Sequence, residues 1–143
     1  MEEHAHDINP GRAPRRRKLV VVISSDRAFA ESLRSNLARD FDVLLARDGG
    51  EAAAKSQAVQ VDVDLVDLGS PILGVSALGR MKGLNPQPII CALALPEGPL
   101  AQSRFDFDYV LARPDSGINF PDRVRFILAK ENSNKKKNHQ EDN

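Results

Sequence analysis

Residues able to bind an ion or to act in catalysis stand after the apolar runs of this 143-residue chain. The positions that close an apolar run or follow one are Ser24, Ser25, Asp26, Asp67, Gly69, Leu93 and Arg113. An aspartate with neighbouring hydroxyls could hold a metal ion or a phosphate, and the same aspartate could instead pair with the arginine. Which chemistry is open to these residues depends on whether the fold brings them together.

The apolar runs alternate with segments of helical character. Residues 19–23, Leu-Val-Val-Val-Ile, form a continuous β-branched run, which is typical of a strand covered on both faces. Helix starts are indicated by Ser25 or Asp26 as a cap and by Pro121 in a first turn. Strands are predicted at residues 19–23, 42–46, 61–66, 89–93 and 109–112, and a short helix at 76–82.

This alternation, with its short connections, predicts an α/β fold in which a doubly wound sheet holds five parallel strands. The weakest predicted helix lies within residues 95–107, where Pro96, Gly98 and Pro99 leave room for about two turns at most. Ligands of such folds bind at the carboxyl ends of the strands. We therefore expect the chemically capable residues to converge at that edge.

Three motifs, in chain order, resemble those of the receiver domain of response regulators (CheY-like). Residues 47–52, Arg-Asp-Gly-Gly-Glu-Ala, are similar to the start of the family's helix two, and residues 62–71 to its third strand, phosphoacceptor aspartate and proline. Residues 108–114 are similar to its fifth strand and Lys-Pro ending. The resemblance covers residues 18–130. It implies a flavodoxin-like strand order of 2-1-3-4-5, Asp67 as the phosphoacceptor-like residue, and a bacterial two-component signalling or phosphorelay setting.

The pocket of that family is altered here, so the chain resembles a degenerate receiver, or pseudo-receiver. Ser24 and Ser25 stand in place of the acidic pair that holds Mg²⁺ in the family. Leu93 stands where a threonine or serine ends strand four, and Arg113 replaces the lysine after strand five. Of the phosphorylation constellation, only Asp67 is unchanged.

These replacements remove the negative charge that Mg²⁺ requires, because hydroxyls are neutral and the ion prefers carboxylate oxygens. Asp67 and the carbonyl of Gly69 remain as possible ligands, while Asp26 lies one position late and is expected to point elsewhere. We therefore expect no metal and no cofactor. We predict instead that Asp67 pairs directly with Arg113, with the serine hydroxyls filling the remaining bonds, so that the domain is held in one state without phosphate.

The composition indicates a soluble globular protein, with 41% hydrophobic and 28% charged residues. Lysine plus arginine and aspartate plus glutamate number twenty each, so no global field favours nucleic acid or an acidic membrane. The apolar run at 19–23 is too short for a signal peptide or a membrane span, which predicts a cytoplasmic location. The only cysteine, Cys91, lies in an apolar run and is expected to be a buried, unreactive thiol.

Three parts of the chain differ in composition. Residues 1–17 are polar and lack strand or helix periodicity, which predicts a flexible leader. Residues 18–130 carry the receiver-like domain. Residues 131–143 hold no apolar side chain, so they are expected to form a disordered tail or linker.

Three functions follow from these observations. The preferred one is non-enzymatic: a phosphate-independent domain that binds an unidentified signalling protein, with neither nucleic acid nor membrane as partner. In the family, helix four, strand five and helix five commonly meet partners, and this surface here includes Tyr109 and Leu111.

The second function is that of a phosphorylatable response regulator that accepts phosphate on Asp67 with an altered Mg²⁺ site. The third, a small doubly wound enzyme or ligand-binding domain, is poorly supported because no phosphate-binding glycine motif is present and all three histidines lie in the predicted tails.

Overall fold

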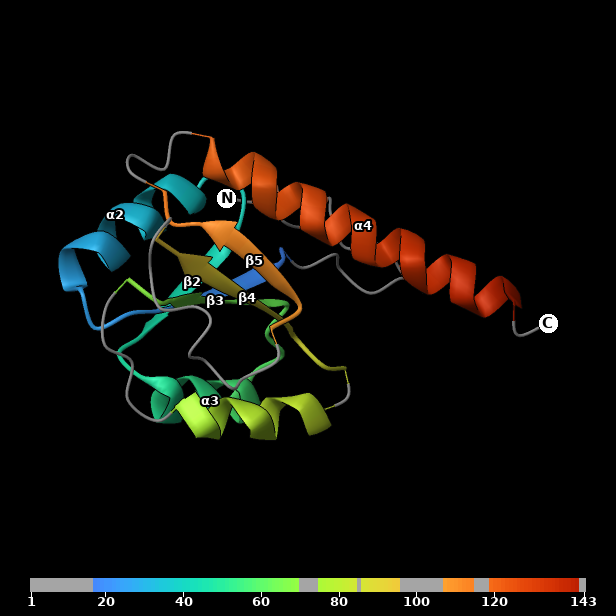
Figure 1. Cartoon of the computed structure of the whole chain (residues 1–143), viewed down its shortest axis with the longest axis horizontal. Helices are drawn as coiled ribbons and strands as arrows, with labels where there is room; N and C mark the ends of the chain where they lie inside the picture. Colours follow the sequence, from blue (N-terminus) through green and yellow to red (C-terminus); the bar gives the residue numbers. More distant parts are fainter. Residues whose placement is uncertain (1–16, 70–74, 85, 96–106, 115–118, 142–143) are drawn as a thin grey trace, which may run out of the picture.

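The centre of the molecule is a parallel sheet of five strands in the order β2-β1-β3-β4-β5 (Figure 1). This computed structural model describes residues 17–69, 75–84, 86–95, 107–114 and 119–141. The strands are β1 (Leu19–Ile23), β2 (Asp42–Ala46), β3 (Val63–Asp67), β4 (Ile89–Ala94) and β5 (Tyr109–Ala112). The predicted fold class and strand order are therefore confirmed.

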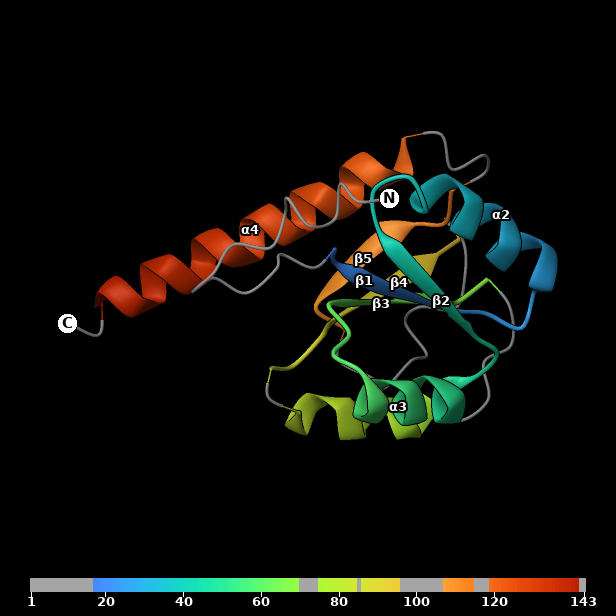
Figure 2. The ribbon, with the colours of Figure 1, turned by 180° about the vertical axis from the view of Figure 1, so that it is seen from behind.

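Helices cover both faces of this sheet (Figures 1 and 2). On one face lie α2 (Arg27–Leu37) and the first half of α4 (Phe120–Glu141). On the other lie α3 (Gly49–Ala58) and η1 (Val75–Gly83), a 3₁₀ helix. The second half of α4 extends beyond the body of the domain in both views.

The central strand β1 shows why its sequence is apolar throughout. Val20 and Val22 pack into the layer under α2 and α4, whereas Val21 and Ile23 pack into the layer under α3 and η1. All four side chains are fully buried. A parallel strand with a helical layer on each side has no solvent face, so the alternation typical of half-exposed strands is lost.

Two aspartates fix where the helices on either side of β2 begin. Asp26 caps α2 by accepting a hydrogen bond from the N–H of Phe29 at 3.1 Å. Asp48 caps α3 by accepting one from the N–H of Glu51 at 2.8 Å. Each bond satisfies a donor that has no partner within its own helix. The cap at Asp26 sets the position of the first turn of α2.

The observed element bounds differ from the predicted ones in a few places. The strands β1, β2 and β5 have the predicted ends, while β4 runs one residue further than predicted. The third strand begins and ends later than the predicted 61–66 and so includes Asp67. The short helix predicted at 76–82 is present as a 3₁₀ helix. The segment predicted as the weakest helix falls almost entirely in 96–106, outside the described residues, as does the predicted leader up to residue 16.

The C-terminal helix is longer than the sequence predicted. Residues 131–141, expected to be part of a disordered tail or linker, continue α4 as far as Glu141. Adding a residue to an existing helix avoids the cost of nucleation, and lysine, glutamine and glutamate all favour helix, which explains how a segment without apolar side chains continues the packed one. The division of the chain into leader, domain and tail stays a prediction. Across the described residues, no helix is long and apolar enough to cross a membrane.

Candidate functional site

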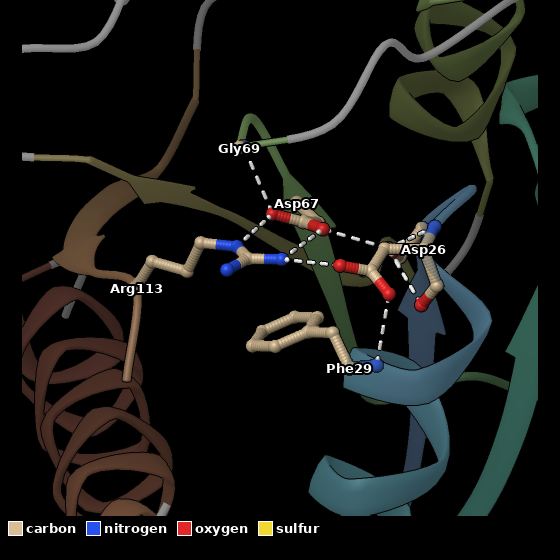
Figure 3. A network of polar contacts seen from close by, with 6 residues as sticks. Asp26, Phe29, Asp67, Gly69 and Arg113 are labelled. Carbon is tan, nitrogen blue, oxygen red and sulfur yellow. Dashed lines mark hydrogen bonds and ion pairs between the residues drawn. The ribbon is translucent and has the colours of Figure 1, made fainter. Parts of the chain in front are cut away.

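Three of the predicted site residues stand at strand ends that meet at the carboxyl edge of the sheet. Asp67 is the last residue of β3, Ser24 follows β1, and Arg113 follows β5. Figure 3 shows the side chains of Asp67 and Arg113 pointing at each other, with Asp26 and Phe29 beside them. Parallel strands produce this convergence because all of their carboxyl ends lie at the same edge.

Asp67 and Arg113 form a two-point ion pair. The Arg113 Nε donates to Asp67 Oδ1 at 2.7 Å, and Nη2 donates to Oδ2 at 3.2 Å. The Asp67 side chain is fully buried, and that of Arg113 is 19% exposed. The planar guanidinium matches the two carboxylate oxygens, which gives the pair a fixed geometry as well as charge attraction. The predicted contact between these residues is thus confirmed.

Two further donors bind the Asp67 carboxylate. The hydroxyl of Ser24, itself buried, donates to Oδ2 at 2.6 Å, and the N–H of Gly69 donates to Oδ1 at 2.9 Å. Each carboxylate oxygen therefore accepts one hydrogen bond from Arg113 and one from another group. A buried carboxylate is stable in its charged form only when it is supplied with donors in this way.

The electrostatics of the site keep Asp67 ionised. Burial by itself raises the pKa of Asp67, but the hydrogen bonds from Arg113, Ser24 and Gly69 outweigh this effect and hold the pKa below its ordinary value. The pKa of Arg113 is raised in turn, chiefly by its hydrogen bond to Asp67. Both groups are therefore charged at any pH near neutrality.

Asp26 belongs to this site, contrary to the expectation that it points elsewhere. Its Oδ2 lies 3.3 Å from Nη2 of Arg113, while Oδ1 caps α2. The expectation was wrong because it compared sequence positions with those of the family. Here the chain forms a tight turn after β1, in which the N–H of Asp26 donates to the hydroxyl of Ser24 at 3.0 Å.

Phe29 is a member of the site that sequence reasoning missed. The guanidinium carbon of Arg113 lies 3.8 Å from the centre of the Phe29 ring, a cation–π contact (Figure 3). The available signal was the helical spacing, because residues three apart on a helix share a face and Phe29 stands three positions after Asp26. These two residues place one charge and one ring against the same guanidinium.

Gly69 makes room for the arginine. A Cβ added at this position would lie 2.5 Å from Nε and 2.6 Å from Cδ of Arg113. At contacts this short one of the groups must shift, so a side chain at this position would displace Arg113 from where it now reaches Asp67. The sequence analysis named Gly69 for its carbonyl, whereas the structure shows a role for its N–H and for its missing side chain.

The remaining predicted pocket residues, Ser25 and Leu93, differ in burial. Ser25 is exposed. Leu93 is fully buried in the core under α2 and α4, and its carbonyl accepts a hydrogen bond from the N–H of Leu68 at 2.8 Å. Cys91 is fully buried in the same layer, and burial raises the pKa of its thiol to about 12, so it is unreactive as predicted.

The residues present do not fit a magnesium ion. Mg²⁺ needs carboxylate oxygens with free lone pairs in a near-octahedral shell. Both oxygens of Asp67 already accept two hydrogen bonds, and the guanidinium of Arg113 stands against them as the counter-charge. The second carboxylate, Asp26, is bound to the same guanidinium. In the described part of the chain, no group of three or more histidine, cysteine or acidic residues is placed to hold a metal ion.

Solved structures with the same arrangement of strands and helices exist for several proteins. A CheY-like response regulator receiver domain from Methanospirillum hungatei is 19% identical, with a TM-score of 0.66 over 82% of this chain and 98% of that one. The signal receiver domain of an HD domain-containing protein from Pseudomonas fluorescens is 19% identical, with a TM-score of 0.67 over 87% and 96%. The chain has the fold of a receiver domain.

A third neighbour is also a response regulator. The response regulator protein TrrA from Thermotoga maritima, solved in complex with Mg²⁺ and BeF, is 20% identical, with a TM-score of 0.62 over 76% of this chain and 96% of that one. Identities at this level concern the fold alone. No family model matches the sequence, and no curated protein matches it either.

Proposed function

We propose that this chain is a receiver-like signalling domain that acts through contact with another protein and does not require phosphate on Asp67. The fold supports the general class, because its structural neighbours include receiver domains of response regulators and one of an HD domain-containing protein. The equal numbers of acidic and basic residues favour a protein partner over nucleic acid or a membrane surface. The proposal includes a cytoplasmic location and no enzymatic activity.

The observation that carries the proposal is the saturated carboxylate of Asp67. A phosphoacceptor needs an oxygen with a free lone pair to attack phosphorus, and it needs cations that neutralise the phosphoryl oxygens. Here each oxygen of Asp67 already accepts two hydrogen bonds, one of them from Arg113. The same arginine also contacts Asp26 through Nη2 and stacks on the ring of Phe29. The site is thus complete without metal or phosphate.

The alternative function is a phosphorylatable response regulator. The ionised state of Asp67 and its place at the end of β3 favour this alternative, because a charged carboxylate at the sheet edge is what attack on phosphorus needs. It requires Arg113 to leave the carboxylate and Mg²⁺ to enter beside Ser24, whose hydroxyl brings no negative charge.

An amide-detected NMR titration with Mg²⁺ and beryllofluoride separates the two functions. On the proposed function, the spectrum of the full chain stays unchanged, because the site offers the ion no free carboxylate. Saturable shifts centred on Asp67, Gly69 and Arg113 contradict the proposal and establish the alternative.

A matched variant shows that the titration can detect binding. The triple variant Ser24→Asp, Ser25→Asp, Arg113→Lys restores the acidic pair and the lysine of the receiver family, and we expect it to gain Mg²⁺-dependent shifts around Asp67. The variant Asp67→Asn controls for changes at other sites, since any shifts that survive in it do not report on the carboxylate.

A further inference from the structure

Asp64 is a second buried carboxyl group on β3, and the site around Asp67 does not use it. Its side chain is fully buried. Within the described residues, neither Oδ1 nor Oδ2 has a hydrogen-bond partner. Buried polar groups in folded proteins are almost always hydrogen-bonded, and a buried charge without a partner is costly. A group of this kind is stable only while it keeps its proton.

The strand register places Asp64 in the middle of the apolar layer under α3 and η1. Its backbone neighbours are Val21 on β1 and Ile90 on β4, and both side chains belong to that layer. Alternation along β3 puts Asp64 on the same face as Val66 and on the face opposite Leu65. Packed over this layer are the side chains of Ala53, Leu78 and Met81.

The ionisable groups on the elements around this layer lie at its margins. They are Asp48 before α3, Glu51 and Lys55 on α3, Arg80 and Lys82 on η1, and Asp62 and Asp108 before β3 and β5. Each of the acids among them accepts a hydrogen bond from a backbone N–H: Asp48 from Glu51, Glu51 from Arg47, Asp62 from Leu19 and Asp108 from Ile90. Lys82 lies 4.0 Å from Asp108. Asp64 differs from these acids in having no partner among the described residues.

We propose that proton loss from Asp64 loosens the packing of α3 and η1 on the sheet, which makes this layer a pH-sensitive device. The charged form cannot stay in a layer of valine, isoleucine, leucine and methionine side chains without a counter-ion. Admitting water requires the covering helices to move, and η1 is a 3₁₀ helix, whose hydrogen-bond geometry is poorer than that of an α-helix. The layer lies on the opposite face of β3 from Asp67, so the inference does not rest on the proposed function.

The pH window follows from burial. Burial raises the pKa of Asp64 from 3.8 to about 7. The folded state therefore holds a proton that the unfolded state releases between these two values, and folding stability declines as pH rises through this window. Above about pH 7 both states are ionised and the loss is complete. The layer is tight in mild acid and loosened in mild base.

Two measurements on the full chain test this inference. The first is a ¹³C-carboxyl NMR titration, in which we expect the Asp64 signal to titrate with a midpoint near pH 7. The second is amide hydrogen exchange between pH 5 and pH 8, expressed as protection factors. We expect protection in α3 and η1 to fall roughly a hundredfold relative to that in α2 over this range, as the linkage relation gives for such a shift.

Variants assign the effect to one side chain. Asp64→Val should abolish the pH dependence and raise protection of α3 and η1 at pH 8, because valine suits the apolar layer. Asp42→Asn, at a side chain that is 58% exposed, should leave the dependence as in the unmodified chain. A carboxyl midpoint below pH 5, or protection in α3 and η1 that stays in step with α2, overturns the proposal. The titration decides even if Asp64→Val fails to fold.

Discussion

Two aspartates on one strand, both without exposed surface, have opposite ionisation behaviour. Asp64 and Asp67 both have fully buried side chains on β3. The pKa of Asp67 lies below its ordinary value, because Arg113, Ser24 and Gly69 supply hydrogen bonds that outweigh the effect of burial. The pKa of Asp64 is raised to about 7 by burial alone, because no described group offers it a bond.

The difference shows that hydrogen-bond partners can outweigh the effect of burial on the charge of an acid. The carboxyl edge of the sheet gives Asp67 access to a turn, to a neighbouring strand end and to the arginine after β5. The middle of the sheet gives Asp64 only strand neighbours whose own backbone groups are already paired in the ladder. Asp64, three residues before the end of β3, therefore lacks the donors that stabilise the charged form of Asp67 at the end of the strand.

The largest expected effect is obtained by removing the partner of Asp67. Arg113→Ala leaves a buried carboxylate without its counter-ion, and we expect the free energy of unfolding at pH 7 to drop by about 3 kcal/mol. The pKa of Asp67 should then rise above its ordinary value, which makes this residue resemble Asp64. Urea denaturation and a ¹³C-carboxyl titration measure the two changes.

A control separates the pair from a general loss of surface charge. Arg47→Ala removes an arginine that is 87% exposed and pairs with Glu51 in the first turn of α3, and it should cost under about 0.5 kcal/mol. Equal losses for Arg113→Ala and Arg47→Ala would mean that the buried pair contributes nothing special to stability.

An intermediate effect is expected from filling the space at Gly69. Gly69→Ala puts a Cβ where Nε and Cδ of Arg113 lie, so the guanidinium must withdraw and part of the two-point pair is lost. We expect a loss of about 2 kcal/mol in urea denaturation, of the order for a weakened buried hydrogen-bonded pair.

Coupling between the two positions is the decisive control for this prediction. Adding Gly69→Ala to Arg113→Ala should cost little more than Arg113→Ala alone, because the clash is with the arginine side chain. Gly79→Ala, where an added Cβ meets no atom within 4 Å, should leave stability unchanged or slightly higher. Additive losses in the double variant would show that the glycine matters for another reason.

The smallest expected effect is the pH dependence of the stability that Asp67 contributes. Because the folded-state pKa of Asp67 is lowered, its contribution is fully present above its ordinary value of 3.8 and is lost as pH falls through the folded value. The stability difference between the unmodified chain and Asp67→Asn should therefore be constant above about pH 5 and shrink in acid. This slope is opposite to that of Asp64. Urea midpoints measured from neutral to acidic pH give the difference, and a gap that widens in acid would reverse the assigned direction.

Most of the fold could be predicted from the sequence, because strand and helix patterns are strong in this chain. The continuous apolar run of β1 and the strand–helix alternation led to a parallel sheet, and the ends of β1, β2 and β5 agree with the prediction. The pairing of Asp67 with Arg113 was also predicted, since both follow strands whose carboxyl ends share one edge. Patterns of this kind depend on backbone period and topology, which local residue types largely determine.

Features that depend on side-chain packing escaped prediction. The stacking of Phe29 on Arg113 and the bond from Arg113 to Asp26 depend on how the first turn of α2 faces β5, which no local pattern encodes. Asp64 was placed within a predicted strand, but its lack of a partner emerges only when its neighbours on β1 and β4 are known. The space above Gly69 is likewise a property of the assembled edge.

The contact between Asp26 and Arg113 joins positions that lie 87 residues apart in the chain. Nearly every strand must be in place before these side chains can meet. The chain therefore loses the conformational entropy of ordering the sheet before this bond contributes any stabilisation. A contact of this range stabilises the finished structure and does little to guide the chain toward it. We therefore expect the contact between Arg113 and Asp26 to form late in folding, and to slow the unfolding of the domain more than it speeds its folding.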